Sequence, residues 1–112
     1  MIKSEVNSEH YTWGGICDGW HLAKSKSLSV IKERVPPGCS EVRHLHQQAE
    51  QFFYILSGQA SIEIDGIEHT LNANQGIHVC SGVPHQFHNK SENEVVFLVT
   101  STPPSHGDRV EV

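Results

Sequence analysis

The sequence is a succession of short segments in which apolar and polar residues alternate, each closed by turn-forming residues. Residues 28–35 alternate and stop at Pro36-Pro37-Gly38, and residues 60–64 alternate up to Asp65-Gly66. Asp-Gly favours a two-residue hairpin turn, because glycine adopts the positive φ that this turn requires. Further short segments are residues 42–46, 67–71, 77–80, 85–89 and 95–100, and residues 51–56 are aromatic and β-branched, which suits a strand buried on both faces. Short strands at near-regular spacing predict an antiparallel sandwich or barrel.

Length and composition indicate the number of domains and argue against several classes of partner. A chain of 112 residues forms one domain, and we place the barrel core at residues 28–101, a lead-in at 1–27 and a tail at 102–112. The net charge of −5 argues against the basic surface that nucleic acid requires. No apolar run has the length of a membrane-spanning helix, and residues 1–9 lack the features of a signal peptide. We therefore expect a cytoplasmic protein with no nucleic-acid or membrane partner.

Histidine is the unusual residue of this chain. It occurs nine times, more often than lysine and arginine together. His44 and His46 lie two residues apart in a predicted strand, so their side chains project from the same face. Both imidazoles can then reach one metal ion at bond lengths of about 2.0–2.1 Å. Such a pair also occurs in proteins that bind no metal, so the surrounding residues decide how it is interpreted.

The surroundings of this pair resemble the first motif of the cupin superfamily. A glycine precedes the histidines, a polar residue follows them, and a second glycine closes the motif: Gly38, Gln51 and Gly58. The segment 81–89 resembles the second motif of the same family, with its glycine, histidine and asparagine at Gly82, His85 and Asn89. Because both motifs occur in the right order, the chain resembles a small single-domain cupin.

The resemblance implies an all-β fold, the single-domain antiparallel jelly-roll β-barrel also called a double-stranded β-helix. It places metal ligands at His44, His46 and His85, and it implies a homodimer, since cupins are commonly dimers. The chain departs from the family pattern at Asn74, where the family has glycine, and at Cys80, where it has proline. Asparagine also tolerates the left-handed backbone conformation that a turn requires.

The fourth ligand in this family is usually a glutamate seven residues before the closing glycine, and here that position holds Gln51. The neighbouring Glu50 is the alternative, and only one of the two can be a ligand because adjacent strand residues face opposite sides. We favour Gln51, since strand pairing fixes its distance to Gly58 while the loop at 47–49 can absorb an extra residue. Three imidazoles and an amide leave a divalent ion its full charge, which makes it a stronger Lewis acid.

These residues predict a site for one divalent transition metal, which can be Zn, Ni, Fe, Co or Mn. The expected function is an enzyme acting on a small polar substrate, such as a sugar acid or keto acid, by Lewis-acid or enolisation chemistry. The candidate catalytic bases are Glu50, Tyr54 and His78. The expected walls of the pocket are Phe53, Ile55, Ile62, Ile64 and Phe87.

Other functions stay open at this point. The same barrel can bind a metal and a small molecule without turning it over, as a sensor, carrier or accessory subunit. It can also be an Fe(II) dioxygenase, because an iron with open coordination positions binds O₂. A third alternative is a barrel whose metal site is vestigial.

Overall fold

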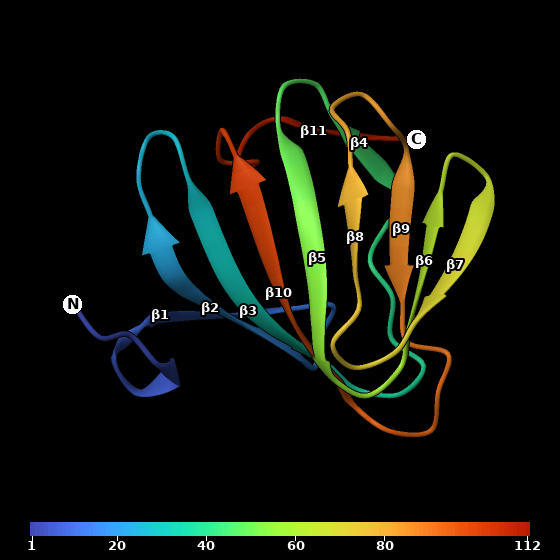
Figure 1. Cartoon of the computed structure of the whole chain (residues 1–112), viewed down its shortest axis with the longest axis horizontal. Helices are drawn as coiled ribbons and strands as arrows, with labels where there is room; N and C mark the ends of the chain where they lie inside the picture. Colours follow the sequence, from blue (N-terminus) through green and yellow to red (C-terminus); the bar gives the residue numbers. More distant parts are fainter.

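The computed structural model describes residues 1–112, and its regular secondary structure is almost entirely β-strand (Figure 1). One 3-10 turn, Glu5–Asn7, precedes the first strand. No helix has the length and hydropathy needed to span a membrane. The strands are β1 (Glu9–Trp13), β2 (Cys17–Lys24), β3 (Ser29–Val35), β4 (His44–His46), β5 (Glu50–Ser57), β6 (Ala60–Ile64), β7 (Ile67–Leu71), β8 (Gly76–Val79), β9 (His85–His88), β10 (Val95–Thr102) and β11 (Arg109–Glu111).

The strands form two antiparallel sheets. One has the order β1-β2-β3-β10-β5-β8 and the other the order β11-β4-β9-β6-β7. Strands that are distant in sequence are therefore neighbours, for example β3 and β10, which pair from Val35↔Val95 to Ser29↔Ser101. This topology confirms the predicted all-β, antiparallel jelly-roll fold.

Alternate strand residues from the two sheets form the hydrophobic core. Phe53, Phe87 and Phe97 are at most 4% exposed, and the rings of Phe87 and Phe97 stack with centroids 4.3 Å apart. Ile55 and Ile62 are completely buried beside them. Burial of each such side chain contributes about 1.5–3 kcal/mol to folding, and the packed core gives the strands of the site a fixed frame.

The turns follow the sequence closely. Asp65 and Gly66 have φ angles of 51° and 88°, as the hairpin between β6 and β7 requires. Asn74 adopts the left-handed conformation with φ of 68°, which confirms that asparagine replaces glycine here without loss of the turn.

The lead-in and the tail also contribute strands. β1 and β2 extend the larger sheet beyond β3, and β11 pairs with β4 through Arg109↔His46 and Glu111↔His44. In Figure 1 the C-terminal segment runs close to β4 at one end of the molecule. The lead-in and the tail thus add strands to the two sheets beyond the predicted core at 28–101.

Candidate metal centre

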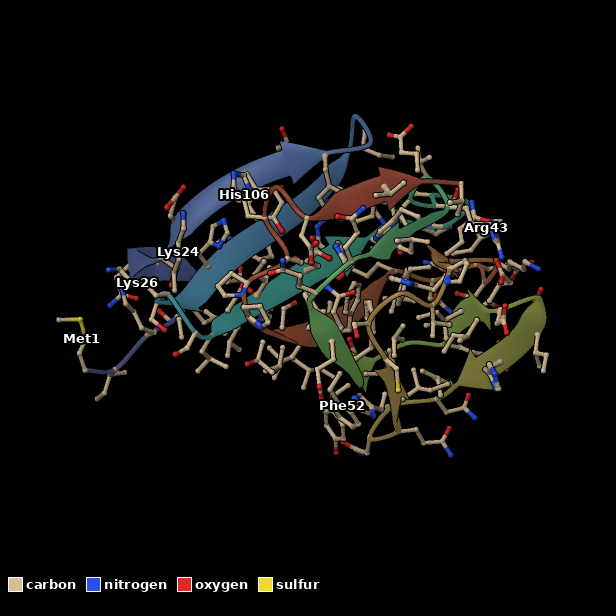
Figure 2. All side chains as sticks on the ribbon, turned by 90° about the horizontal axis from the view of Figure 1, so that it is seen from above. Met1, Lys24, Lys26, Arg43, Phe52 and His106 are labelled. Atoms are coloured by element: carbon tan, nitrogen blue, oxygen red, sulfur yellow. The ribbon has the colours of Figure 1, made fainter.

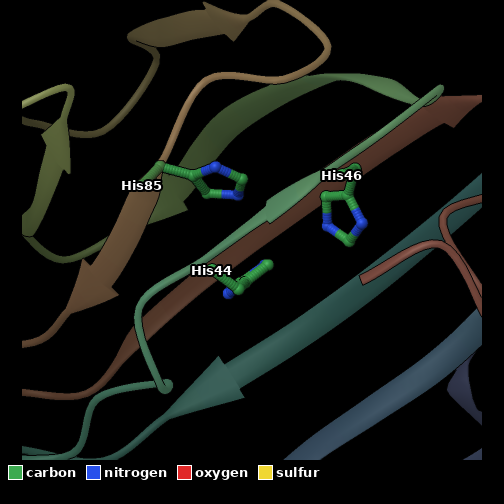
Figure 3. Close-up of side chains that lie close together, drawn as sticks. All are labelled: His44, His46 and His85. Atoms are coloured by element: carbon green, nitrogen blue, oxygen red, sulfur yellow. The ribbon is translucent and has the colours of Figure 1, made fainter. Parts of the chain in front are cut away.

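Three histidines from two adjacent strands converge at one point. β4 supplies His44 and His46, β9 supplies His85, and His44 pairs directly with His85 across the two strands. Their possible ligand nitrogens all lie within 4.8 Å of one another, and all three residues are buried. Figure 3 shows the three rings turned toward a shared space. Nitrogens bound to one ion at 2.0–2.1 Å are roughly 3–3.5 Å apart, so a small ring movement completes the geometry.

Backbone carbonyls fix the orientation of two of these rings. The Nδ1–H of His44 donates to the carbonyl oxygen of Val42 at 2.7 Å, and that of His85 donates to Val83 at 3.0 Å. A carbonyl only accepts hydrogen bonds, so each ring keeps the proton on Nδ1 and directs the lone pair of Nε2 toward the cluster. The Nε2 atom of His85 and the Nδ1 atom of His46 are buried without a hydrogen-bond partner. Unpartnered buried nitrogens of this kind fit a bound metal ion.

The electrostatics of the cluster keep the imidazoles neutral. Burial, together with a smaller effect of the neighbouring His85, lowers the pKa of His44 and of His46 to about 4. Burial also lowers the pKa of His85. A metal binds the neutral imidazole, so at neutral pH no proton has to leave before binding.

The structure brings Gln51 into this region and directs Glu50 away from it. Gln51 is 7% exposed, its amide nitrogen donates to Ser101 Oγ at 3.0 Å, and its Oε1 is buried without a partner. Glu50 lies on the exposed face of β5, where its carboxylate pairs with His78 at 3.0 Å. The two neighbours thus face opposite sides, as the sequence required. A neutral amide oxygen without a donor is chemically suited to be a fourth ligand, and this role of Gln51 stays a prediction.

A cavity of about 670 Å³ opens beside the cluster, and its wall includes His44, His46 and Gln51. That volume lies in the usual range for small-molecule sites. Of the expected wall residues, only Phe53 lines the cavity. The other four expected wall residues, Ile55, Ile62, Ile64 and Phe87, instead belong to the hydrophobic core or pack against it.

None of the three candidate bases from the sequence lines this cavity. Glu50 and His78 pair on the exposed outer face, and Tyr54 lies on that same face of β5. The structure therefore does not bring Glu50, Tyr54 or His78 to the histidine cluster.

Sequence reasoning missed two glutamates that do line the cavity, Glu33 and Glu41. Burial raises the pKa of Glu33 to about 7, although its hydrogen bond from Tyr11 opposes that rise. Burial also raises the pKa of Glu41 to about 8. The sequence did carry a signal for Glu33, because strand alternation places it on the same face as the inward-facing Ile31 and Val35.

Comparison with protein families finds a match to the cupin domain over residues 31–101. Among proteins of known sequence, the chain is 34% identical over 91 residues to an uncharacterized protein of Streptomyces coelicolor, covering 79% of this chain and 85% of that protein. It is 28% identical over 79 residues to the HTH-type transcriptional regulator PuuR of Escherichia coli, covering 70% of this chain. The chain spans only 43% of the length of that regulator.

Solved structures share the fold. A protein of Thermotoga maritima described as a predicted oxalate decarboxylase superposes with a TM-score of 0.84 at 19% identity, covering 93% of this chain and all of that chain. A protein of Silicibacter pomeroyi described as a sugar phosphate isomerase from a cupin superfamily gives a TM-score of 0.81 at 21% identity, covering 93% of this chain and 76% of that chain. At such identities the likeness establishes the architecture alone.

Proposed function

Because the chain belongs to the cupin family through its domain at residues 31–101, we propose that it is a mononuclear metal-dependent enzyme acting on a small polar organic acid. The observation that carries the proposal is the convergence of three buried, neutral histidines, two of which, His44 and His46, line a cavity of about 670 Å³. Support for a small-molecule substrate comes from the volume of the cavity and from the polar side chains among its lining residues.

His44, His46 and His85 would hold one divalent transition metal, with Gln51 as the fourth protein ligand. Such an ion, when bound, polarises a carbonyl or carboxyl oxygen of the substrate and so acidifies the neighbouring C–H bond. All four donors are neutral, which leaves the ion its full charge. The chain itself supplies the rigid orientation, through the carbonyls of Val42 and Val83 that hold two of the rings.

Enolisation of an acid also requires a group that accepts and returns a proton. Glu33 lines the cavity, and its pKa of about 7 is suited to both steps at neutral pH. We therefore assign this role to Glu33 in preference to Glu50, Tyr54 and His78, which lie outside the cavity.

The test combines metal analysis with turnover. Freshly purified protein is assayed for bound metal, then loaded with Zn²⁺, Ni²⁺, Mn²⁺, Co²⁺ or Fe²⁺ and offered a panel of sugar acids, keto acids and dioxygenase substrates. We expect about one metal per chain, turnover of a sugar acid or keto acid, and loss of the metal in His85→Asn. Protein that holds metal yet turns over no substrate of the panel contradicts the enzymatic proposal.

Glu33→Gln is expected to lower kcat by about 100-fold or more, the usual contribution of a general base. Glu68→Gln is the matched control, because Glu68 is exposed and pairs with Lys90 away from the cavity. If kcat falls comparably in Glu50→Gln and is unchanged in Glu33→Gln, the base is Glu50 on the outer face of β5 and the assignment of Glu33 is wrong.

A second candidate function is metal-dependent binding without turnover. The similarity to the regulator PuuR over 70% of this chain favours it, since that protein is a transcriptional regulator. Tight binding of a small acid by the metal-loaded protein, with no product formed over hours, is the outcome that selects this candidate. If O₂ and a substrate of the panel are consumed only when the protein is loaded with iron, the result would instead select a dioxygenase.

A further inference from the structure

The cavity carries charged groups of both signs. Arg109 lines it from β11, in register with His46. Glu33 and Glu41 line the same cavity, as do Glu9 and Lys24. Carboxyl groups repel a second carboxylate and attract hydrogen-bond donors, so an acid with several donor groups suits this lining.

Glu33 is built into this wall by three strands. Tyr11 of β1 pairs with Gly19 of β2, and Gly19 pairs with Glu33 of β3, so the three residues form one row across the sheet. The Tyr11 hydroxyl crosses over Gly19 and donates to Glu33 Oε2 at 2.7 Å. A Cβ at Gly19 would overlap the Tyr11 ring. The missing side chain at Gly19 is thus what allows the tyrosine to reach the glutamate.

Each of the two carboxyl groups has one oxygen held by the protein and one left over. Tyr11 holds Glu33 Oε2, and the backbone N–H of Phe87 donates to Glu41 Oε1 at 2.9 Å. The remaining oxygens, Glu33 Oε1 and Glu41 Oε2, have no protein partner, and neither is among the buried unpartnered atoms. Two oriented carboxyls therefore present open oxygens to a ligand.

Gln51 indicates where the metal would lie relative to this cavity. It is buried, lines the cavity and has an amide oxygen without a donor, which the proposed function assigns to the metal. The metal and the two glutamates would therefore face the same cavity.

We propose that Glu33 and Glu41 form a hydroxyl-binding subsite, so that the cavity takes a polyhydroxylated acid with its carboxylate at the histidine cluster and the hydroxyls next to its reacting carbon against these two glutamates, which keeps Glu33 beside the C–H bond that it deprotonates. This inference rests on the proposed function and narrows its substrate class from small acids to hydroxylated sugar acids.

Hydroxyl groups fit better than ammonium groups. The pKa values of about 7 for Glu33 and about 8 for Glu41 leave both carboxyls partly protonated at neutral pH. A carboxyl that holds a proton both donates and accepts, and a hydroxyl also does both. An ammonium group only donates, and it is attracted most strongly by fully ionised carboxylates.

The test compares two acids that share a 2-hydroxy acid head and a six-carbon chain. D-gluconate carries further hydroxyls along the chain, and 2-hydroxyhexanoate carries none. Their affinities for zinc-loaded protein, freed of unbound zinc, are measured by isothermal titration calorimetry. We expect gluconate to bind at least about 10-fold more tightly, since a hydrogen bond to a charged group changes affinity by roughly 10-fold or more.

Glu33→Gln should reduce gluconate affinity about 10-fold and leave 2-hydroxyhexanoate unchanged. Tyr11→Phe should weaken gluconate binding by a smaller factor, and that factor should disappear in the Glu33→Gln background, because the tyrosine acts by positioning Glu33. Glu68→Gln is the control on an exposed carboxylate. Melting temperatures establish that each variant is folded.

Equal binding of the two acids by the wild-type protein, or equal losses of both acids in Glu33→Gln, overturns the subsite and leaves the metal proposal intact. Protein that holds zinc but binds neither acid overturns it as well. If the protein holds no zinc, the proposed function fails. In that case gluconate binding to the metal-free protein decides the subsite separately. Binding that Glu33→Gln weakens supports the subsite, and absent binding or binding that Glu33→Gln leaves unchanged overturns it.

Discussion

At the scale of single residues, the cavity combines two kinds of titratable group whose pKa values move in opposite directions. Burial lowers the pKa of His44 and His46 and raises that of Glu33 and Glu41, because in each case it disfavours the charged form. All four groups are consequently uncharged over part of the range between pH 4 and pH 7. A metal ion entering this cavity meets neutral nitrogens as well as carboxyls able to hold protons.

The first residue-scale prediction concerns stability against pH. The pKa of Glu33 is raised in the folded state, so its contribution is complete below about pH 4.5 and is lost as the pH rises toward 7 and above. Glu33→Gln removes this loss. The melting temperature of Glu33→Gln minus that of wild type, both metal-free, should therefore be larger at pH 8 than at pH 5. A difference that is the same at both pH values contradicts a raised pKa.

For the histidines, the predicted stability changes with pH in the opposite direction. Their folded-state pKa of about 4 lies below the ordinary histidine value of 6.5, so the unfolded chain binds more protons between these values. The metal-free protein should lose this contribution as the pH falls from 6.5 toward 4. His44→Asn should reduce the acid sensitivity of the melting temperature over that window, as measured by differential scanning calorimetry. An unchanged slope would show that His44 already carries its proton at pH 6.

A further residue-scale prediction tests Gln51 as a ligand. Gln51→Glu places a negative charge against the ion and should tighten Zn²⁺ binding by at least about 10-fold, judged by Coulomb attraction at bonding distance. Competition with a chromophoric chelator measures the change. Gln51→Ala should weaken binding, and Glu50→Ala should leave it unchanged because Glu50 points outward. Loss of metal in Glu50→Ala alone contradicts the assignment.

At the scale of secondary-structure elements, the C-terminal segment secures the loop that follows the metal-binding strand. The carboxylate of Asp108 accepts hydrogen bonds from the backbone N–H groups of Gln47, Gln48 and Ala49 at 2.8–3.2 Å. These bonds hold the pKa of Asp108 below its usual range. One side chain thus fixes the chain between His46 and Gln51.

Asp108→Ala is expected to weaken Zn²⁺ affinity and to raise hydrogen exchange at residues 47–49, because the backbone N–H groups of Gln48 and Ala49 lose their acceptor and that of Gln47 keeps only the main-chain carbonyl of residue 108. In wild type, the lowered pKa means that this contribution is present above the ordinary pKa of an aspartate and is lost as the pH falls below it. Amide exchange followed by mass spectrometry measures the protection of residues 47–49, and competition with a chromophoric chelator measures the Zn²⁺ affinity. Unchanged protection of residues 47–49 in the variant would argue against this role.

The elements also show what the sequence can and cannot reveal. Alternation identified β3 and β6 because each has one apolar face, and Asp65-Gly66 identified its turn by chemistry. β5 was identified by its aromatic and β-branched residues as a strand buried on both faces, whereas the structure buries mainly one face. β1, β2 and β11 were missed because their residues are mostly exposed or half-buried, so no clean apolar face appears in the sequence. The strand motifs located the histidines, whereas the approach of Tyr11 to Glu33 depends on a register across three strands that only the fold establishes.

At the scale of the whole molecule, metal binding and folding are coupled. The site joins β4 and β9 within one sheet, and unfolding separates its ligands. Zn²⁺ at 100 times its dissociation constant should therefore stabilise the fold by about 2.7 kcal/mol, which corresponds to a rise in melting temperature of roughly 10 °C for a domain of this size. His85→Asn should show almost no rise, and an equal rise in that variant would place the zinc elsewhere.

The homodimer remains a prediction, and light scattering in solution checks it. The outer face of β5 carries the exposed side chains of Phe52 and Leu56. Figure 2 shows Phe52 on the opposite side of the molecule from His106, which lines the cavity.

The pairing of β11 with β4 has a practical consequence. Val112 still donates its backbone N–H to the carbonyl of Arg43, so the last residues brace the strand that carries His44 and His46. Proteolytic trimming of a few residues from this end would release that strand edge while leaving the hydrophobic core intact. A nicked sample would then look well folded by circular dichroism and yet release its ion readily, so intact mass should be verified before any metal titration.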